Sequence, residues 1–144
     1  MRLTGLLITL ALLAVIWELG WGLSGLSRLG PRELRRRLDS GWKPLLIDVR
    51  TPREYRWFHI PGAINAPFGS AELETALELH ARADQSPPPV VFICMTGHRS
   101  PLAAWSLRRT GLGEVHDLAG GMLAWKFIGG PTVEGPEPFG SGGS

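Results

Sequence analysis

The sequence of 144 residues contains a single cysteine, Cys94. One thiol excludes an intrachain disulfide and a metal site built from several cysteines, so Cys94 is either an inert buried thiol or a reactive one. The sequence also lacks a strong charge imbalance: its net charge is only +2, and its arginines form no stripe interleaved with aromatic residues. We therefore expect no nucleic-acid partner, and no motif indicates a metal ion or a cofactor.

The composition divides the chain into three parts. Residues 1–27 form an apolar N-terminal segment, and residues 129–144 are rich in Gly, Pro and Ser, a composition that predicts a disordered tail. Residues 28–128 remain between them. About a hundred residues are enough to bury one α/β core but not two.

The N-terminal segment has the length and composition of a membrane-spanning helix. No charged residue occurs from Leu3 to Ile16, and residues 3–27 are long enough to cross a hydrocarbon layer of about 30 Å. Trp17 and Trp21 suit the headgroup level, and the nearby Glu18 is tolerable close to an interface. We expect an uncleaved anchor. A signal peptide cleaved near residue 24 is the alternative.

The charges that flank this segment predict its orientation. Only Arg2 and the terminal amine precede it, whereas six basic residues follow: Arg28, Arg32, Arg35, Arg36, Arg37 and Lys43. Positive charge stays on the cytoplasmic side. We therefore expect a single-pass protein of a bacterial-type inner membrane with its domain facing the cytoplasm, or, if the segment is cleaved, an exported domain.

Short apolar runs alternate with helical patterns in the remaining chain. Strands are expected within residues 44–50, near residue 64, at 90–93 and at 115–118. Helices are expected at 31–38, after 51, at 70–83, at 101–109 and at 122–127. The connections are too long for hairpins, so we predict an α/β fold with an open parallel sheet and helices on both faces.

Cys94 stands where this fold places ligands. It follows the run at 90–93, and a helix begins soon after it. Ligands bind at the carboxyl ends of parallel strands, and the N–H groups of a tight loop before a helix form an anion-binding cradle. Gly97 allows the loop to curl. The cradle and the positive charge of Arg99 favour the thiolate form of Cys94.

Four sequence motifs, in the same order along the chain, resemble the motifs of one protein family. The segment Cys94-Met95-Thr96-Gly97-His98-Arg99-Ser100 resembles the C-x-x-G-x-R-S loop of single-domain rhodanese homology proteins. The family's other motifs are matched by Leu46-Ile47-Asp48-Val49-Arg50 with Glu54-Tyr55, by His59-Ile60-Pro61-Gly62-Ala63-Ile64-Asn65, and by Leu118-Ala119-Gly120-Gly121 with Trp125. The resemblance covers residues 30–128 and implies a rhodanese-like fold.

The resemblance implies a sulfurtransferase. Cys94 would take a sulfane sulfur from thiosulfate or a persulfide, hold it as a persulfide, and pass it to cyanide or a thiol acceptor. The persulfide-binding loop would comprise Met95, Thr96, Gly97, His98 and Arg99. A membrane-tethered persulfide carrier or sensor with little turnover is the alternative. Since neither Met95 nor Thr96 is cationic, the resemblance favours a persulfide or protein donor over thiosulfate.

Loop length argues against a related chemistry. Cysteine phosphatases and arsenate reductases of similar fold have a loop one residue longer, which fits a tetrahedral oxyanion, whereas four residues separate Cys94 from Arg99.

Asp48, Arg50 and Glu54 are expected to support the loop. For Asp48 and Arg50 we favour a fold-maintaining ion pair over a catalytic role. For Arg99 we favour pairing with Glu54 over contact with the donor.

Overall fold

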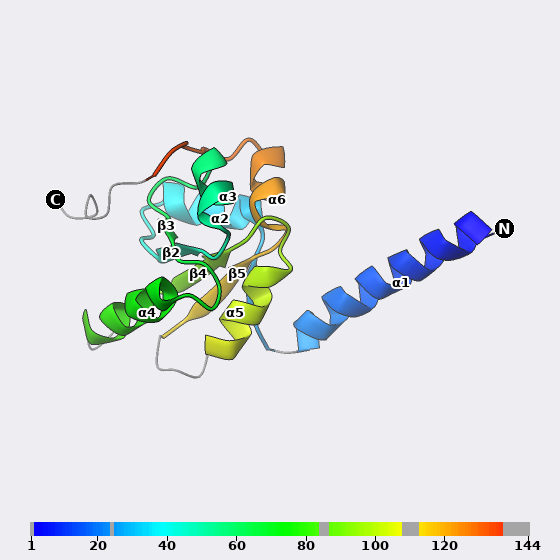
Figure 1. Cartoon of the computed structure of the whole chain (residues 1–144), viewed down its shortest axis with the longest axis horizontal. Helices are drawn as coiled ribbons and strands as arrows, with labels where there is room; N and C mark the ends of the chain where they lie inside the picture. Colours follow the sequence, from blue (N-terminus) through cyan, green and yellow to red (C-terminus); the bar gives the residue numbers. More distant parts are fainter. Residues whose placement is uncertain (1, 24, 84–86, 108–112, 137–144) are drawn as a thin grey trace.

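The described residues form an α/β domain built on a parallel sheet, and one long helix precedes this domain in the sequence (Figure 1). The computed structural model describes residues 2–23, 25–83, 87–107 and 113–136. Its strands are β1 (Ser27–Leu29), β2 (Leu45–Asp48), β3 (Ile64–Asn65), β4 (Val90–Ile93) and β5 (Val115–Leu118). They lie in the order β1-β5-β4-β2-β3 with every pair parallel, so β4 is central. The expected fold class is confirmed.

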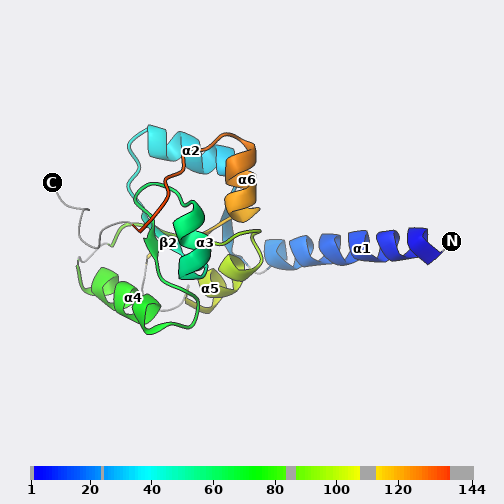
Figure 2. The same ribbon diagram turned by 45° about the horizontal axis from the view of Figure 1, so that its top comes forward.

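Helices cover both faces of the sheet. These helices are α2 (Pro31–Asp39), α3 (Pro52–Trp57), α4 (Ala71–Ala83), α5 (Arg99–Leu107) and α6 (Gly121–Phe127), whereas α1 (Arg2–Leu23) precedes the domain and does not cover the sheet (Figure 1). Figure 2 shows α2 and α6 above the sheet region and α4 and α5 below it. The connections between parallel strands require this arrangement, because each must cross one face of the sheet to reach the next strand.

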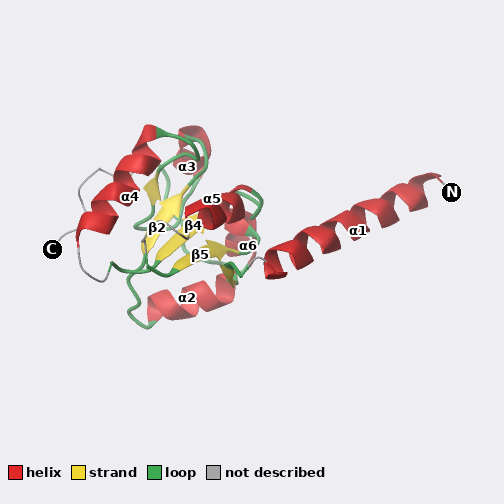
Figure 3. Ribbon diagram, turned by 90° about the horizontal axis from the view of Figure 1, so that it is seen from below, coloured by secondary structure: helices red, strands yellow, loops and turns green. Residues whose placement is uncertain are grey.

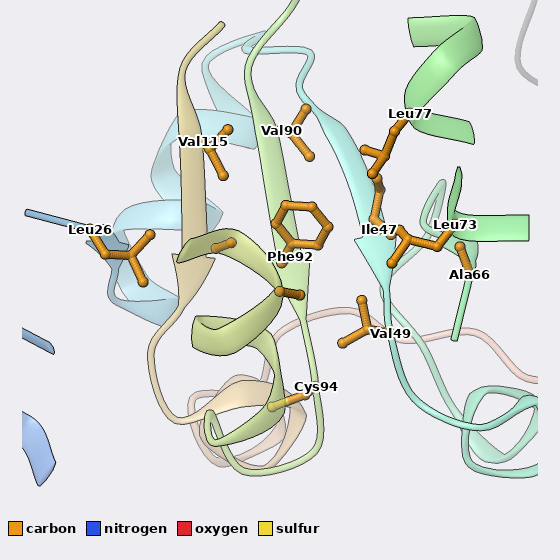
Figure 4. Close-up of a cluster of buried hydrophobic side chains, with 12 residues drawn as sticks. Leu26, Ile47, Val49, Ala66, Leu73, Leu77, Val90, Phe92, Cys94 and Val115 are labelled. Atoms are coloured by element: carbon orange, nitrogen blue, oxygen red, sulfur yellow. The ribbon is translucent and has the colours of Figure 1, made fainter. Parts of the chain in front are cut away.

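Alternation along β4 divides the core into two clusters. Val90 and Phe92 pack with Leu73 and Leu77 of α4 and with Ala103 of α5 (Figure 4). Val91 and Ile93 point to the other face, where the partners are Leu34 of α2, Tyr55 of α3, and Met122 and Trp125 of α6. All four β4 side chains are therefore buried. An uninterrupted apolar run is typical of a central parallel strand that is covered on both faces.

The edge strand β1 was not predicted. Residues 27–29 lie between the apolar segment and the first helix of the domain, and three residues are too few to show an alternating pattern. Pairing of Ser27 with His116 and of Leu29 with Leu118 in β5 creates the strand. Leu29 is buried there.

The expectation of disorder from residue 129 is wrong for residues 129–136. The N–H of His59 donates to the carbonyl of Val133 at 2.9 Å, and the N–H of Val133 returns a bond to His59 at 3.0 Å. The indole N–H of Trp125 donates to the carbonyl of Pro131 at 2.9 Å. Pro131 and Val133 are thus ordered by hydrogen bonds to residues elsewhere in the fold, and the composition of the segment cannot predict such bonds. Residues 137–144 lie outside the described residues.

Helix α1 extends away from the domain in every view (Figure 3). Leu3–Leu23 has a mean hydropathy of 2.0 and is long and apolar enough to cross a membrane. Large apolar side chains along it, from Leu3 to Leu19, are mostly exposed. Near its C-terminal end, by contrast, Trp17 and Trp21 are half-buried, and Trp21 packs against the cluster that contains Phe92.

Candidate active site at the carboxyl end of β4

Cys94 lies where the central strand passes into the loop before α5 (Figure 4). Its side chain is fully buried. The backbone N–H of Gly97 donates to Cys94 Sγ at 2.9 Å, as expected for a loop curled around the sulfur. Gly97 has a φ of +80°, and a Cβ at this position would lie 2.7 Å from the backbone nitrogen of Gly120. Both the curl and the close approach to Gly120 therefore require glycine.

The start of α6 forms the other wall of the loop. The N–H of Met122 donates to the carbonyl of Cys94 at 2.8 Å, and that of Leu123 donates to the carbonyl of Met95 at 3.0 Å. Gly121 has a φ of +58°, and a Cβ there would meet the backbone of Met95 at 2.7 Å. The second glycine of the Gly120-Gly121 pair thus lets α6 contact the loop backbone directly.

Two charged residues that the sequence did not indicate as site residues, Asp117 and Arg28, complete the site. Ser100 Oγ lies 3.2 Å from Cys94 Sγ and is hydrogen-bonded to the carboxylate of Asp117. Arg28 Nε donates to the other oxygen of Asp117 at 3.0 Å. Burial raises the pKa of Asp117, and hydrogen bonds from Ser100 and Arg28 oppose that shift. An acid within the predicted strand at 115–118 was the available signal, because an acid that is buried in a sheet requires a polar partner.

Arg99, in the first turn of α5, pairs with Glu54 of α3. The two guanidinium nitrogens lie 2.7 and 3.1 Å from the two carboxylate oxygens, the bidentate geometry that arginine favours. Glu54 also closes a capping box with Thr51. The hydrogen bond from Arg99, aided by those from Thr51, lowers the pKa of Glu54 to about 2. The pairing that we favoured for Arg99 is therefore present.

Because the pKa of Glu54 is lowered, we expect its contribution to the free energy of unfolding to depend on pH. A carboxyl with a lowered folded-state pKa contributes stability above its ordinary pKa, near 4.5, and this contribution is lost as the pH falls through about 2. Glu54→Gln should lower the unfolding free energy near pH 6 by about 1 kcal/mol or less, since the pair is partly exposed. The deficit should shrink towards pH 3.

Urea unfolding of the full chain in detergent, followed by circular dichroism at both pH values, measures this difference. Glu78→Gln is the matched control, because Glu78 forms an exposed pair with Arg82 at 3.5 Å on α4. The control should show little change at either pH. A Glu54→Gln deficit that is equal at pH 6 and pH 3 would contradict the assignment.

Asp48 and Arg50 form a fully buried ion pair beneath the loop. Arg50 Nη2 lies 2.7 Å from Asp48 Oδ2 and donates to the carbonyl of Phe58 at 2.6 Å. Arg50 Nη1 approaches the sulfur of Met95 at 4.0 Å. Asn65 donates to the carbonyls of both Asp48 and Arg50. This network joins β2, β3 and the segment after α3, a placement that suits the fold-maintaining pair we favoured.

The remaining loop residues form its outer face. Thr96 and His98 are exposed and Met95 is half-buried. Thr96 Oγ1 lies 2.9 Å from His98 Nδ1, and the imidazole lies 5.5 Å, between ring centroids, from the indole of Trp17 in α1.

The sequence matches the Rhodanese-like domain family over residues 30–127. Similar proteins include the "Probable adenylyltransferase/sulfurtransferase MoeZ" of Mycobacterium tuberculosis, 40% identical over 69% of this chain and 24% of that protein. Another is the "Putative sulfur carrier protein YrkF" of Bacillus subtilis, 29% identical over 71% of this chain and 52% of that protein. The chain thus spans about a quarter to a half of these relatives' lengths.

Solved structures agree with this assignment. A thiosulfate sulfurtransferase from Pseudomonas aeruginosa matches with a TM-score of 0.65 and 27% identity, over 76% of this chain and 20% of that one. A Rhodopseudomonas palustris protein of unknown function, a possible tyrosine phosphatase, matches with a TM-score of 0.62 and 29% identity, over 76% of this chain and 86% of that one. The chain belongs to the rhodanese-like family and is homologous to sulfurtransferase domains and sulfur carriers.

Proposed function

We propose that this protein is a sulfurtransferase that carries sulfur as a Cys94 persulfide. The observation that carries the proposal is the hydrogen bond from the Gly97 N–H to Cys94 Sγ, 2.9 Å long, inside a loop with four residues between Cys94 and Arg99. Such a bond stabilises negative charge on sulfur. A second sulfur atom is a smaller occupant than a phosphate, which suits a short loop.

The reaction takes place in two displacements. The Cys94 thiolate attacks the sulfane sulfur of the donor, a new S–S bond forms, and the donor's own bond to that sulfur breaks, releasing sulfite or a thiolate. An acceptor thiolate or cyanide then attacks the outer sulfur of the persulfide. The Cys94–sulfur bond breaks, and the thiolate is regenerated without net oxidation of the protein.

We propose a persulfide, of a small thiol or of a protein, as the preferred donor. Arg99 is the cation of the loop, and its guanidinium is engaged by Glu54. Met95 and Thr96 bring no positive charge to bind a sulfonate. Sulfur transfer from glutathione persulfide should therefore be faster than transfer from thiosulfate.

Mass spectrometry after donor exposure tests the persulfide directly. The intact protein should gain the mass of one sulfur atom from glutathione persulfide, and a reductant should remove it. Peptide mapping should place the added sulfur on Cys94. Absence of the adduct, or hydrolysis of aryl phosphates at about 1 per second or more, would contradict the proposal and favour phosphatase chemistry.

A sulfur carrier or sensor with slow turnover is the second candidate. The complete burial of Cys94 favours it, because a closed loop protects a persulfide better than it admits successive substrates. Turnover separates the two: an enzyme forms thiocyanate or a new persulfide continuously, whereas a carrier stops after about one equivalent unless its partner is present.

We further propose that α1 anchors the protein in a bacterial-type inner membrane with the domain in the cytoplasm. The exposed apolar side chains of α1 support insertion. The basic residues after α1 support this orientation, and a reducing compartment suits a lone reactive thiol. Such an anchor would keep the Cys94 loop near the membrane surface, because Trp17 at its C-terminal end contacts His98.

Fractionation of cells that express the full chain tests the anchor. The protein should remain in the membrane pellet after carbonate washing, and Cys94 should resist a membrane-impermeant maleimide in intact cells. The same maleimide applied to opened vesicles without denaturant is the control, because the burial of Cys94 slows its reaction on either side of the membrane. A soluble mature protein that begins near residue 25, found outside the inner membrane, would contradict both the anchor and the orientation.

A further inference from the structure

A single hydroxyl group separates the Cys94 thiol from a buried carboxyl group. Ser100 Oγ lies 3.2 Å from Cys94 Sγ and is also hydrogen-bonded to Asp117 Oδ1. A serine hydroxyl has one hydrogen and cannot donate to both groups at once. It therefore either donates to the Asp117 carboxylate while accepting from the Cys94 S–H, or donates to the Cys94 thiolate while accepting from a protonated Asp117.

The surroundings of Asp117 allow either state. Its side chain is fully buried in β5, and burial raises its pKa while Ser100 and Arg28 act in the opposite direction. Arg28 Nε donates a hydrogen bond to Asp117 Oδ2 at 3.0 Å, and Arg28 Nη1 donates one to Glu18 Oε2 of α1 at 2.5 Å. Since Arg28 divides its positive charge between two acids, it neutralises Asp117 only in part.

We propose that Ser100 and Asp117 form a proton relay that generates the Cys94 thiolate. The S–H bond of Cys94 breaks as its proton passes to Ser100 Oγ, and the original Ser100 proton passes to Asp117. The thiolate then receives the hydrogen bond of the new Ser100 hydroxyl. The relay moves protons only, and it runs in reverse when the Cys94 thiol reforms. The proposal rests on the proposed role of Cys94 as the nucleophile.

The roles of the three residues differ. Ser100 touches the reacting sulfur and is a catalytic residue, whereas Asp117 and Arg28 act through it and are positioning residues. Besides Arg28 and Glu18, the charged or titratable groups near this site include His98 in the loop and Arg99 in α5. The pKa of Arg99 is raised chiefly by its hydrogen bond to Glu54 and also by the negative charges of Glu54 and Cys94. Only one of the two relay states contains a Cys94 thiolate, so the positive charge of Arg99 favours that state.

The pH profile of Cys94 alkylation tests the relay. Cys94 is the single cysteine of the sequence, so the rate of iodoacetamide modification of the full chain in detergent reports on it alone. An isolated thiol loses reactivity about tenfold per pH unit below its ionisation. Two coupled groups instead titrate in two steps. The wild type should show an intermediate plateau, because a pair that holds one proton still contains a thiolate fraction.

Asp117→Asn and Ser100→Ala should each remove the plateau and leave a single steep decline towards acid pH. The controls are Asp39→Asn, an exposed acid on α2, and Ser106→Ala, whose hydroxyl bonds to the carbonyl of Ala103 within α5. Both should keep the two-step profile. His98→Gln should also keep it, which separates the relay from the titration of the imidazole.

Several outcomes overturn the relay. A one-step profile in the wild type does so whether or not the variants fold. A plateau that persists in Asp117→Asn, or one that is lost in His98→Gln, does so as well. A merely structural role for Asp117 would lower the alkylation rate by the same factor at every pH. Alkylation needs no sulfur donor, so the relay can hold while sulfur transfer fails, and the two proposals are tested separately.

Discussion

Replacing Cys94 with serine is expected to reduce sulfur transfer to the uncatalysed background. Serine is nearly isosteric with cysteine, and its oxygen can accept the hydrogen bond that Gly97 N–H donates to Sγ. The oxygen cannot form and release a persulfide at a useful rate, however, because the mechanism depends on a thiolate nucleophile and an S–S bond. Cyanide-dependent formation of thiocyanate from a persulfide donor, and from thiosulfate, measures the loss.

The same variant should keep the fold, which far-UV circular dichroism and the thermal midpoint would show. Ser106→Ala, a change of similar size on α5, should retain wild-type activity. Thiocyanate formation by Cys94→Ser at more than a few per cent of the wild-type rate would contradict a Cys94 mechanism. Loss of structure together with activity would require the alkylation and mass measurements on the wild type to decide the role of Cys94.

Gly121→Ala is expected to destabilise the fold strongly although it adds only one methyl group. The added Cβ would collide with the carbonyl oxygen of Cys94 and with the backbone of Met95. Backbone atoms cannot rotate away, so α6 must separate from the loop, at a cost of about 3 kcal/mol or more when steric and left-handed strain add. Displacing Met122 N–H from the carbonyl of Cys94 should also distort the cradle.

Gly129→Ala is the matched control for this variant. Gly129 has a φ of +69°, close to the +58° of Gly121, but a Cβ there meets no atom within 4 Å. It should cost only the backbone strain, about 1–2 kcal/mol, and leave Cys94 alkylation unchanged. Urea unfolding of both variants measures the difference. Equal destabilisation would mean that the contact between α6 and the loop does not constrain the cradle.

Features that depend on neighbours along the chain could be predicted from the amino-acid sequence alone. The apolar run at 90–93 predicted the central strand, the Cys94 loop predicted a cradle, and the composition of residues 3–27 predicted a long apolar helix. Each of these signals lies within one segment. The Arg99–Glu54 pair, although it joins α5 to α3, was also foreseen, because both residues belong to motifs of one family.

Which distant groups meet at the Cys94 thiol depends on the three-dimensional fold and could not be predicted. Arg28 and Asp117 are 89 positions apart in the sequence and Ser100 and Asp117 are 17 apart. They converge because β5 lies between β1 and β4 in the sheet. Strand order is set by how the helices cover the two faces and not by any local pattern. For the same reason the sequence could not show that β1 exists, that Val133 pairs with His59, or that one serine hydroxyl joins Cys94 to a buried acid.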